Sequence, residues 1–564
     1  MAGTMVVSSY AVTRNVLAPM RDGVRLAADL WLPTTNAPVP AVLFRTPYGR
    51  SAYHADVLRP QQCVEAGFAA IVQDMRGRSD SEGRWEPLNW AVEAEDTYDT
   101  VEWVAAQTWC SGAVGMSGVS YSGTVQHTSS LLRPPHLRAI APTMASSPEF
   151  DRVESGGSLR LDLAISWLAV TCLDWVLRPG VTGLDTQSIG LILRAVSDPR
   201  FLYLTRPLRD LPLFGIAGFP ITFDELYSRL NHPADANAID LEIPTLHIGG
   251  WFDISHSTAV NLFRRQAAAG NQASHLVMGP WAHSNHLPQS QGQVNFGALA
   301  SAGGARLPAL VLDFFREHLA GESATVPRVK YFLMNSGNWY EDQAWPPPAS
   351  EPQHLFLGTD GIAGSLTPSR PEGAAGADEY RYDPDDPTPT VGGRNLNVGR
   401  LSPGPISQEA LHVRSDLLRY TGSSVTEPLD IVGAVKAKLF VSSSAVDTDF
   451  FVKLLDVDPA GVAVAVCEGG IPLRHRFGYD HEQQYSPGEV ASLDVDLGHT
   501  AWRVLPDHRL ALQIQSANFP QLNPNPNTGE PVGDSVNSVV ATNTVLRDHR
   551  HASFLQFDAI QHRP

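Results

Sequence analysis

The sequence is poor in cysteine, and it lacks both an excess of positive charge and a long apolar run. Its four cysteines are Cys63, Cys110, Cys172 and Cys467. They are scattered along the chain, without a CxxC pair, and their spacing fits neither a zinc site nor a disulfide framework. We expect them to be reduced core residues. The 41 Lys and Arg residues stand against 59 Asp and Glu residues, giving a net charge of −18. No basic stripe reverses this charge locally, so nucleic acid is not an expected partner.

Membrane insertion is not expected either. No segment offers about 18 uninterrupted apolar residues, the length that a helix needs to span a bilayer. Residues Met1 to Asn15 lack a basic stretch followed by an apolar one, the pattern of a secretion signal. The sequence therefore predicts a soluble cytoplasmic protein with no membrane partner.

The chain is long enough to form two or three domains, at 564 residues with 43% hydrophobic residues. Residues 1–145 alternate short apolar runs with helical stretches, which predicts a mostly parallel sheet flanked by helices. Residues 146–240 lose this rhythm and form a helical insertion. The alternation resumes over residues 241–351, so we expect one α/β core that is built from two parts of the chain.

Individual elements can be assigned within this pattern. Strands are expected at Ala41–Arg45, Ala69–Gln73, Val114–Ser117, Leu137–Ala141, Pro244–Ile248 and Leu276–Met278. Helices are expected at Val92–Gln107, near Ser257–Ala268 and near Pro308–Leu319. The segment Leu159–Leu177 is apolar nearly all round, which predicts a helix buried between layers.

Residues 352–564 have a different character, because Gly, Pro, Asp and Ser separate short β-rich runs. Examples of these runs are Lys438–Ser442, Val452–Val457 and Ala511–Gln515. This pattern predicts an all-β sandwich or jelly roll. Within it, the Gly-, Pro- and Asp-rich segment Gly361–Pro405 is expected to be a long ordered excursion or linker.

The clearest chemical motif is Gly118-Val119-Ser120-Tyr121-Ser122-Gly123, which lies between a predicted strand and a predicted helix. A serine at a tight strand-to-helix turn needs small neighbours, and Gly118 and Gly123 supply them. The pattern is that of a nucleophile elbow, with Ser120 at its apex. Ser117 and Ser122 are rival nucleophiles, but one falls inside the strand and the other in the first turn of the helix.

A serine hydroxyl needs a base and an orienting carboxylate, which follow in the order Asp then His in α/β-hydrolases. Asp253 follows the strand Pro244–Ile248, and His283 follows the strand Leu276–Met278. Both residues are therefore expected at the carboxyl edge of the sheet. His256 and His286 are nearby competitors. His283 and His286 could form a metal pair, but no third ligand stands close in the sequence, so no metal or cofactor is expected.

The oxyanion that forms during acyl transfer needs hydrogen-bond donors. The Tyr121 amide lies at the start of the elbow helix and supplies one. The loop after the strand Ala41–Arg45 contains Tyr48, whose hydroxyl could supply the second; a tyrosine that only packs in a turn is an equally good interpretation of this spacing.

At this point the chain resembles a known family, the cocaine esterase and X-Pro dipeptidyl-peptidase (CocE/NonD) group of α/β-hydrolase serine esterases. The resemblance extends over nearly the whole chain and includes the elbow and both later loops. It also includes four further segments: Met20–Ala27, Gln73–Gly77, Leu439–Phe450 and Ser516–Pro520.

The resemblance implies Ser120, Asp253 and His283 as the catalytic triad, and Tyr48 with the Tyr121 amide as the oxyanion hole. It also implies a hydrolase core with a helical cap insertion and a C-terminal jelly-roll domain. Two protomers often pair in this family, so a homodimer is expected. The implied domain bounds are 1–145 and 241–351 for the core, 146–240 for the cap and 352–564 for the jelly roll.

The substrate pocket can be compared with similar enzymes, in which aromatic residues from the cap line the acyl pocket. Trp167 has such a position here, with Phe150 and Phe252 as further candidates. However, the cap begins with the charged segment Glu149–Glu154, which argues against a benzoyl-sized acyl group.

Relatives that act on α-amino acyl esters hold the substrate ammonium with carboxylates, some of which follow the triad aspartate. Here Asp253 is followed by Ile254, Ser255 and His256, which favours neutral acyl esters of small molecules. The carboxylates Glu149, Asp151 and Glu154 leave a charged substrate open. The alternatives are an X-Pro dipeptidyl-peptidase, an acyltransferase or amidase with the same triad, and a binding protein with an inert hydrolase fold.

Overall fold

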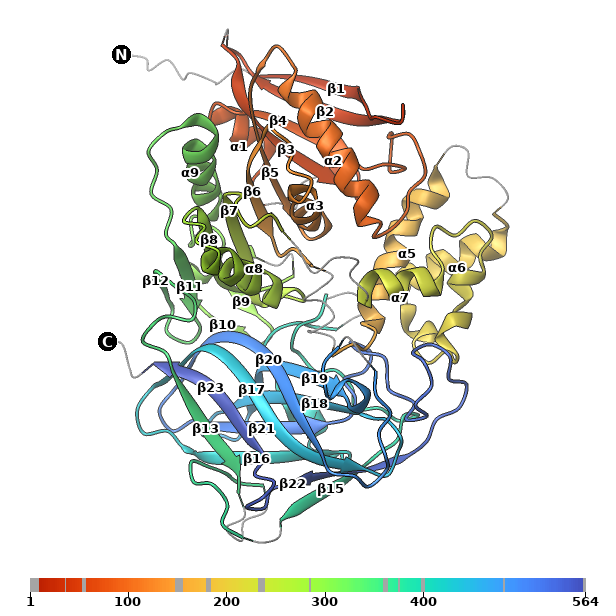
Figure 1. Ribbon diagram of the computed structural model, residues 1–564, viewed down its shortest axis with the longest axis vertical. Helices are drawn as coiled ribbons and strands as arrows, with labels where there is room; N and C mark the ends of the chain where they lie inside the picture. Colours follow the sequence, from red (N-terminus) through yellow and green to blue (C-terminus); the bar gives the residue numbers. More distant parts are fainter. Residues whose placement is uncertain are drawn as a thin grey trace.

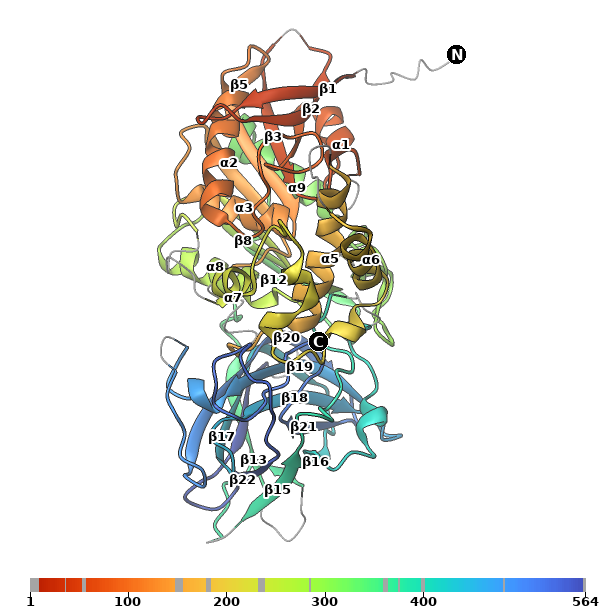
Figure 2. The same cartoon turned by 90° about the vertical axis from the view of Figure 1, so that its right-hand side faces the viewer.

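The computed structural model of the chain describes residues 10–35, 37–52, 57–147, 156–178, 184–231, 239–283, 286–358, 364–373, 376–396, 401–479 and 482–560. An α/β part occupies one end of the long axis and a β-rich part the other, and a small group of helices lies at the side between them (Figures 1 and 2). The predicted fold class, an α/β-hydrolase fold with a C-terminal β-rich domain, is confirmed.

Within the described residues, one mixed sheet of ten strands forms the centre of the α/β part. Its order is β1 (Tyr10–Pro19), β2 (Arg25–Pro33), β4 (Ala69–Asp74), β3 (Val39–Thr46), β5 (Cys110–Val119), β6 (Leu137–Thr143), β7 (Thr245–Phe252), β8 (Ser274–Ala282), β11 (Val329–Leu333) and β12 (Asn338–Asp342). The strands from β4 to β11 are parallel, whereas β1, β2 and β12 pair antiparallel at the two edges. All six predicted strands are therefore present, and the four strands at the two edges, β1, β2, β11 and β12, were not predicted.

Helices cover both faces of this sheet (Figure 1). One face packs against α1 (Pro60–Glu65) and α9 (Leu307–Ala320). The other packs against α2 (Trp90–Ala105), α3 (Tyr121–Ser130) and α8 (His256–Ala268). The central strands are buried on both faces, which explains their continuous apolar runs.

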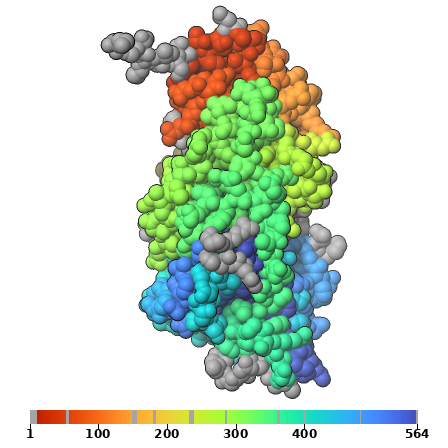
Figure 3. Space-filling model, turned by 90° about the vertical axis from the view of Figure 1, so that its left-hand side faces the viewer, coloured from red at the N-terminus to blue at the C-terminus, as the bar shows by residue number. Residues whose placement is uncertain are grey.

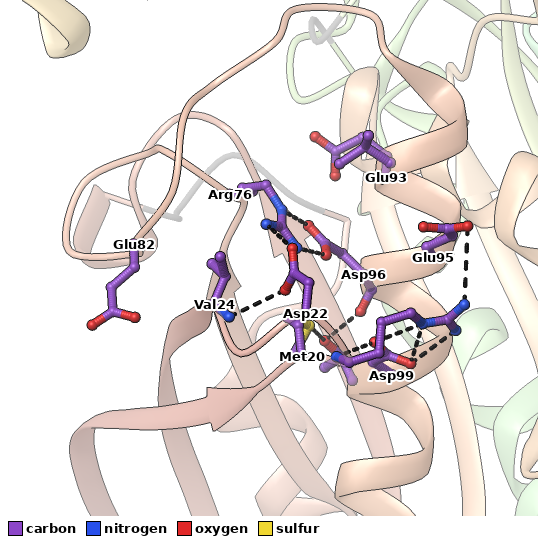
Figure 4. A network of polar contacts seen from close by, with 12 residues as sticks. Met20, Asp22, Val24, Arg76, Glu82, Glu93, Glu95, Asp96 and Asp99 are labelled. Carbon is purple, nitrogen blue, oxygen red and sulfur yellow. Dashed lines mark hydrogen bonds and ion pairs between the residues drawn. The ribbon is translucent and has the colours of Figure 1, made fainter.

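A network of ion pairs holds α2 and the turn between β1 and β2 against the sheet (Figure 4). Arg76 follows β4 and donates to both oxygens of Asp96 on α2, at 2.9 and 2.6 Å, and to Asp22 at 2.7 Å. Deeper in the protein, the fully buried Arg45 donates to Glu93 at 3.2 Å. Burial raises the pKa of Glu93 to about 7 despite this arginine. The segments Met20–Ala27 and Gln73–Gly77 therefore meet in one structural network.

The side helices are α5 (Leu161–Leu177), α6 (Thr186–Ser197) and α7 (Phe223–Asn231). The prediction of a helix buried between layers is only partly correct for α5. Its first part packs on the α/β core, but Val170 and Leu177 expose 47% and 79% of their surfaces. An all-round apolar pattern cannot distinguish a buried helix from one that ends at the surface, so the sequence overestimated its burial.

The described residues of the β-rich part form two antiparallel sheets. One sheet comprises β14 (Leu366–Thr367), β13 (Glu351–Leu357), β23 (Phe554–Ile560), β17 (Leu429–Ser443), β22 (Ala541–Leu546) and β15 (Ala377–Tyr382), with β20 (Ala491–Val504) also paired to β17. The second comprises β16 (Leu417–Ser424), β21 (Arg509–Gln515), β18 (Asp449–Val457) and β19 (Ala463–Pro472). The segment Gly361–Pro405 is not simply an excursion, since it contributes β14 and β15.

The α/β and β-rich parts share one hydrophobic cluster, which includes Trp251 and Met278 from the first part and Val432 and Leu497 from the second. Between them, Met334 follows β11 and forms a β-bridge with Trp502 of β20. Two short strands, β9 (Ser290–Gln291) and β10 (Val294–Asn295), precede α9. The chain from α9 to β13, coloured green, connects the two parts and runs along one face of the molecule from the upper to the lower part (Figure 3).

All four cysteines are free and buried, as predicted. In the described ranges, no helix combines the length and the apolar composition needed to cross a membrane. The domain bounds stay predictions.

Candidate active site

The turn between β5 and α3 holds Ser120 in an unusual backbone conformation. Its φ is 61° and its ψ is −125°, a region that residues other than glycine seldom adopt. The Ser120 amide donates to the Thr143 carbonyl at the end of β6, at 2.9 Å. The side chain makes no cap hydrogen bond to α3, so its hydroxyl points elsewhere.

The two glycines of the motif are required by close packing at this turn. A Cβ on Gly118 would lie 2.6 Å from the Ser122 Cβ and 2.7 Å from the Ser122 carbonyl oxygen. A Cβ on Gly123 would lie 2.7 Å from the Ala145 Cβ. These distances give the physical reason for the small neighbours that the elbow pattern demands.

The register of two parallel strands brings Asp253 and His283 together. Phe252 of β7 pairs with Ala282 of β8, so the residues that follow them leave the sheet side by side. The His283 Nδ1 and the Asp253 Oδ1 are 2.5 Å apart. Asp253 is fully buried and His283 exposes 8% of its surface, so bulk water does not screen this pair.

The second nitrogen of His283 reaches the elbow, since its Nε2 lies 2.9 Å from the Ser120 Oγ. The three residues of the predicted triad thus form one hydrogen-bonded line. The other serines of the motif, Ser117 and Ser122, are buried, with 3% and 2% exposure.

The competing histidines have other surroundings. Burial lowers the pKa of His286 to about 4, and its ring packs at an angle to Trp281, 6.5 Å away. His256 lies at the start of α8 and contacts Arg394 from the β-rich part.

The main-chain amide of Tyr121 is the first in α3, where helix amides have no partner within the helix. This amide and the positive end of the helix dipole therefore lie beside the Ser120 hydroxyl. The Tyr121 ring is buried, and its hydroxyl accepts a hydrogen bond from the Leu88 amide at 3.2 Å. The side chain is thus structural, and only the amide is available to a substrate oxygen.

Tyr48 lies in the loop after β3, at the same edge of the sheet. It exposes 44% of its surface, yet its hydroxyl lies among protein groups and accepts a hydrogen bond from the Trp167 Nε1 at 3.1 Å. Burial of the hydroxyl raises its pKa, while hydrogen bonds with Trp167 and Ser120 and the charge of Arg78 act in the opposite direction. The raised pKa keeps the Tyr48 hydroxyl neutral beside Ser120.

Among the predicted pocket residues, Trp167 contacts the Tyr48 hydroxyl directly. Its ring stacks on the Tyr121 ring at 5.9 Å and 13°. Phe252 exposes only 1% of its surface and packs in the core, so its contact with a substrate stays a prediction. Phe150, with the carboxylates Glu149, Asp151 and Glu154, lies outside the described residues.

Two side chains near the site were not singled out from the sequence. Trp85 packs edge-on against Trp167 at 6.0 Å, and Arg78 lies over the Trp85 ring at 4.2 Å. Both belong to the segment that follows β4, at the edge where the ends of β3, β5, β7 and β8 also meet. That position after a predicted strand was the available signal. Among the described side chains, no cluster of three or more histidine, cysteine or acidic residues is arranged to hold a metal ion.

Comparison with known proteins agrees with this geometry. A family model described as X-Pro dipeptidyl-peptidase (S15 family) matches residues 22–285, and one described as X-Pro dipeptidyl-peptidase C-terminal non-catalytic domain matches residues 323–556. The chain is 34% identical to the cocaine esterase of Rhodococcus sp. (strain MB1 Bresler), over 99% of this chain and 100% of the relative.

Two solved structures share the fold. An α-amino acid ester hydrolase matches with a TM-score of 0.78 and 24% identity over 99% of this chain and 98% of its own. An aminopeptidase from a marine sediment Thaumarchaeota archaeon matches with a TM-score of 0.78 and 22% identity, over 100% and 98% of the two chains. These two matches show the shared fold, and the full-length relative identifies the chain as a serine carboxylic-ester hydrolase. The chain belongs to the cocaine esterase family of α/β-hydrolase serine esterases.

Proposed function

We propose that the protein hydrolyses esters of neutral acyl groups, with Ser120 as the nucleophile, His283 as the general base and Asp253 as the residue that orients the imidazole. The observation that carries this proposal is the hydrogen-bonded line from the Ser120 Oγ to the His283 Nε2, at 2.9 Å, and from the His283 Nδ1 to Asp253, at 2.5 Å. These are the contacts that proton transfer from a serine requires.

The reaction then follows from the positions of the atoms. Ser120 loses its proton to the His283 Nε2 while its oxygen bonds to the ester carbonyl carbon, and the carbonyl oxygen becomes negative. The Tyr121 amide and the Tyr48 hydroxyl donate to that oxygen. His283 gives its proton to the departing alcohol, which leaves an acyl-enzyme. A water molecule, activated by the same histidine, releases the acid and restores the Ser120 hydroxyl.

The preference for a neutral acyl group is supported by the loop that follows Asp253. Its residues are Ile254, Ser255 and His256, and all three expose 6% or less of their surfaces. No described residue of this loop after Asp253 is a carboxylate that could pair with a substrate ammonium. The Trp167 ring, whose Nε1 donates to the Tyr48 hydroxyl, instead offers an apolar surface close to the serine.

A comparison of chromogenic substrates tests the proposal. We expect the wild-type protein to hydrolyse p-nitrophenyl esters of uncharged acids faster than p-nitrophenyl esters of α-amino acids at equal concentration. We expect the Ser120→Ala variant to lose both activities. Faster hydrolysis of the α-amino esters would contradict the neutral-acyl preference and leave the nucleophile assignment intact.

A second candidate function, an X-Pro dipeptidyl-peptidase, is favoured by the family model that matches residues 22–285. It would use the same three residues to cleave an amide bond after proline. Release of p-nitroaniline from Gly-Pro-p-nitroanilide measures this activity directly. We expect it to be slower than ester hydrolysis, and faster release would make the peptidase the principal activity.

Four features of the molecule stay predictions. They are the jelly-roll topology of the β-rich part, the cytoplasmic location, the absence of nucleic acid partners and the pairing of two protomers. Light scattering on the purified protein tests the last of these, because a homodimer has about twice the 61.1 kDa mass of the chain.

A further inference from the structure

Arg78 is a buried arginine that joins three segments of the chain. It follows β4 and exposes 2% of its surface. Its Nε donates to the Pro47 carbonyl at 2.6 Å, and its Nη1 donates to the Thr171 carbonyl at 2.8 Å. Its guanidinium packs over the Trp85 ring, 4.2 Å from the ring centroid. The loop after β3, the helix α5 and the segment after β4 therefore meet at one side chain.

The first two of these segments each carry a residue of the proposed site next to the contact. Pro47 directly precedes Tyr48 in the loop after β3. Thr171 lies one helical turn after Trp167 on α5, and its hydroxyl donates to the Trp167 carbonyl at 2.8 Å. Since Trp167 donates to the Tyr48 hydroxyl, Arg78 holds the backbones on both sides of that hydrogen bond.

The aromatic contact reinforces the same arrangement. Trp85, beneath the guanidinium, packs edge-on against the Trp167 ring at 6.0 Å. A planar guanidinium stacks its face on a ring while its edge donates to carbonyls, whereas a lysine ammonium has donors but no planar face. Arginine therefore suits this combination of contacts better than lysine.

Arg78 forms an ion pair with Asp174, whose Oδ2 lies 3.4 Å from the Nε and whose side chain is 34% exposed. Burial lowers the pKa of the guanidinium, since it loses its hydration. A buried positive charge close to Tyr48 makes the tyrosine hydroxyl a stronger donor, because it favours negative charge on the phenolic oxygen.

We propose that Arg78 is a positioning residue for the reaction: it aligns the Tyr48 hydroxyl with the oxyanion and couples that alignment to the side helix α5. This inference rests on the proposed oxyanion role of Tyr48. Arg78 acts through Tyr48, so its removal lowers kcat more than it raises KM.

A double-mutant cycle with Arg78→Met and Tyr48→Phe tests the proposal, with p-nitrophenyl ester hydrolysis as the readout. Active sites are counted with a fluorophosphonate, so that misfolded protein does not lower kcat. We expect Arg78→Met to reduce kcat at least tenfold and to change KM less than threefold. In the Tyr48→Phe background, we expect the same substitution to change kcat less than twofold.

Arg78→Lys keeps the charge but loses the planar group that stacks on Trp85 while donating to both carbonyls, so its kcat should lie between those of the wild type and Arg78→Met. If Arg78→Met does not fold, the cycle is run with Arg78→Lys, which should slow the wild-type background and not the Tyr48→Phe background.

The matched control is Arg476→Met. Arg476 also donates to backbone carbonyls, those of Leu473, Gln483 and Gln484, and lies over the Phe477 ring, but it belongs to the β-rich part. Its kcat should stay within twofold of the wild type.

Two results would overturn the inference while Tyr48 keeps its role: normal kcat in both Arg78 variants, or an equal loss with and without the Tyr48 hydroxyl. If Tyr48→Phe alone leaves kcat unchanged, the oxyanion assignment itself is wrong and the role of Arg78 falls with it. The cycle therefore separates failure of this inference from failure of the proposed function.

Discussion

Ser120 is held in a backbone conformation that costs free energy, of the order of 1–3 kcal/mol for such a residue. The surrounding contacts maintain it: the amide is tied to Thr143, and Gly118 and Gly123 allow the turn to close. In this conformation the hydroxyl makes no hydrogen bond to α3 and lies within hydrogen-bond distance of His283. Strain at this residue is thus part of how the hydroxyl of the proposed nucleophile is oriented.

Gly118→Ala is expected to destabilise the protein, because its Cβ would meet both the side chain and the backbone of Ser122. Overpacking of this kind costs about 1–3 kcal/mol, and Ser122 must shift to make room for the added methyl group. Urea unfolding and ester hydrolysis should both show a loss. Gly190→Ala on α6 is the control, since nothing lies within 4 Å of its Cβ, and it should stabilise the protein by about 0.5–1 kcal/mol. An active Gly118→Ala protein of wild-type stability would contradict the packing described here.

Tyr48→Phe removes only a hydroxyl, and 44% of the Tyr48 surface is exposed, so the fold should be retained. Loss of one oxyanion donor typically reduces kcat by ~10²–10³-fold. Initial rates over a range of p-nitrophenyl ester concentrations give kcat and KM, and we expect the loss to appear in kcat. Circular dichroism checks the fold. A folded variant with kcat within twofold of the wild type would contradict the role of the Tyr48 hydroxyl as the second donor to the oxyanion.

The residues of the site differ in how far the sequence predicted them. Ser120, Asp253 and His283 were predicted because each follows a strand in the chain order of this fold, and their side chains do meet in the structure. Arg78 was missed, since its role depends on carbonyl groups of Pro47 and Thr171, and backbone acceptors leave no mark in the sequence.

At the scale of helices and strands, α3 and β7 bury two histidines behind the elbow. The rings of His127 and His247 have centroids 6.3 Å apart. Burial lowers the pKa of His127 to about 4, and burial with the charge of His127 lowers that of His247 to about 3. Both must stay neutral for α3 to pack on the sheet.

This pair is expected to make the fold sensitive to acid. The unfolded chain binds protons below a histidine pKa near 6.5 and the folded chain does not, so the stabilisation is complete above that pH and is lost as the pH falls toward about 4. For His127, the loss between pH 7.5 and pH 5 is about 2 kcal/mol.

Urea unfolding of His127→Gln at these two pH values measures that contribution. The variant should lose about 2 kcal/mol less than the wild type between pH 7.5 and pH 5. His354→Gln on the exposed part of β13 is the control and should behave as the wild type. Equal losses in His127→Gln and the wild type would show that His127 is not held neutral in the fold.

Strands were predicted best where they are buried on both faces and lie in segments without many glycine and proline residues. The central strands were predicted because they are buried on both faces, which gives unbroken apolar runs. β1 was not predicted, since it is an edge strand with mostly exposed residues. β15 was missed for a related reason: alternate residues are exposed, and it lies in a segment rich in Gly, Pro and Asp.

On the scale of the whole molecule, the α/β and β-rich parts share a core and should not unfold separately. Trp502 of β20 exposes 1% of its surface and packs edge-on against Phe296, at 6.1 Å. Beside it, the Met334 amide donates to the Ala501 carbonyl at 2.9 Å, and the Arg503 amide donates to the Met334 carbonyl at 3.0 Å. The joint is therefore both apolar and hydrogen-bonded.

Trp502→Ala should lower the stability of both parts, by about 3–5 kcal/mol, because it opens a cavity between them. Loss of ester hydrolysis and loss of tryptophan fluorescence should coincide along a urea titration, at a lower concentration than in the wild type. Val413→Ala, at a residue with 92% exposure, should change stability by less than about 0.5 kcal/mol. Two separate transitions in the wild-type protein would contradict a shared core.

The most direct test of the mechanism is the site at which a fluorophosphonate reacts, because such a probe bonds only to an activated serine. Digestion of the labelled protein and mass spectrometry should find the probe on Ser120 alone. Ser120→Ala should not be labelled, and His283→Ala should be labelled far more slowly. A label on Ser117 or Ser122, or ester hydrolysis that persists in Ser120→Ala, would contradict the assignment of Ser120 as the nucleophile.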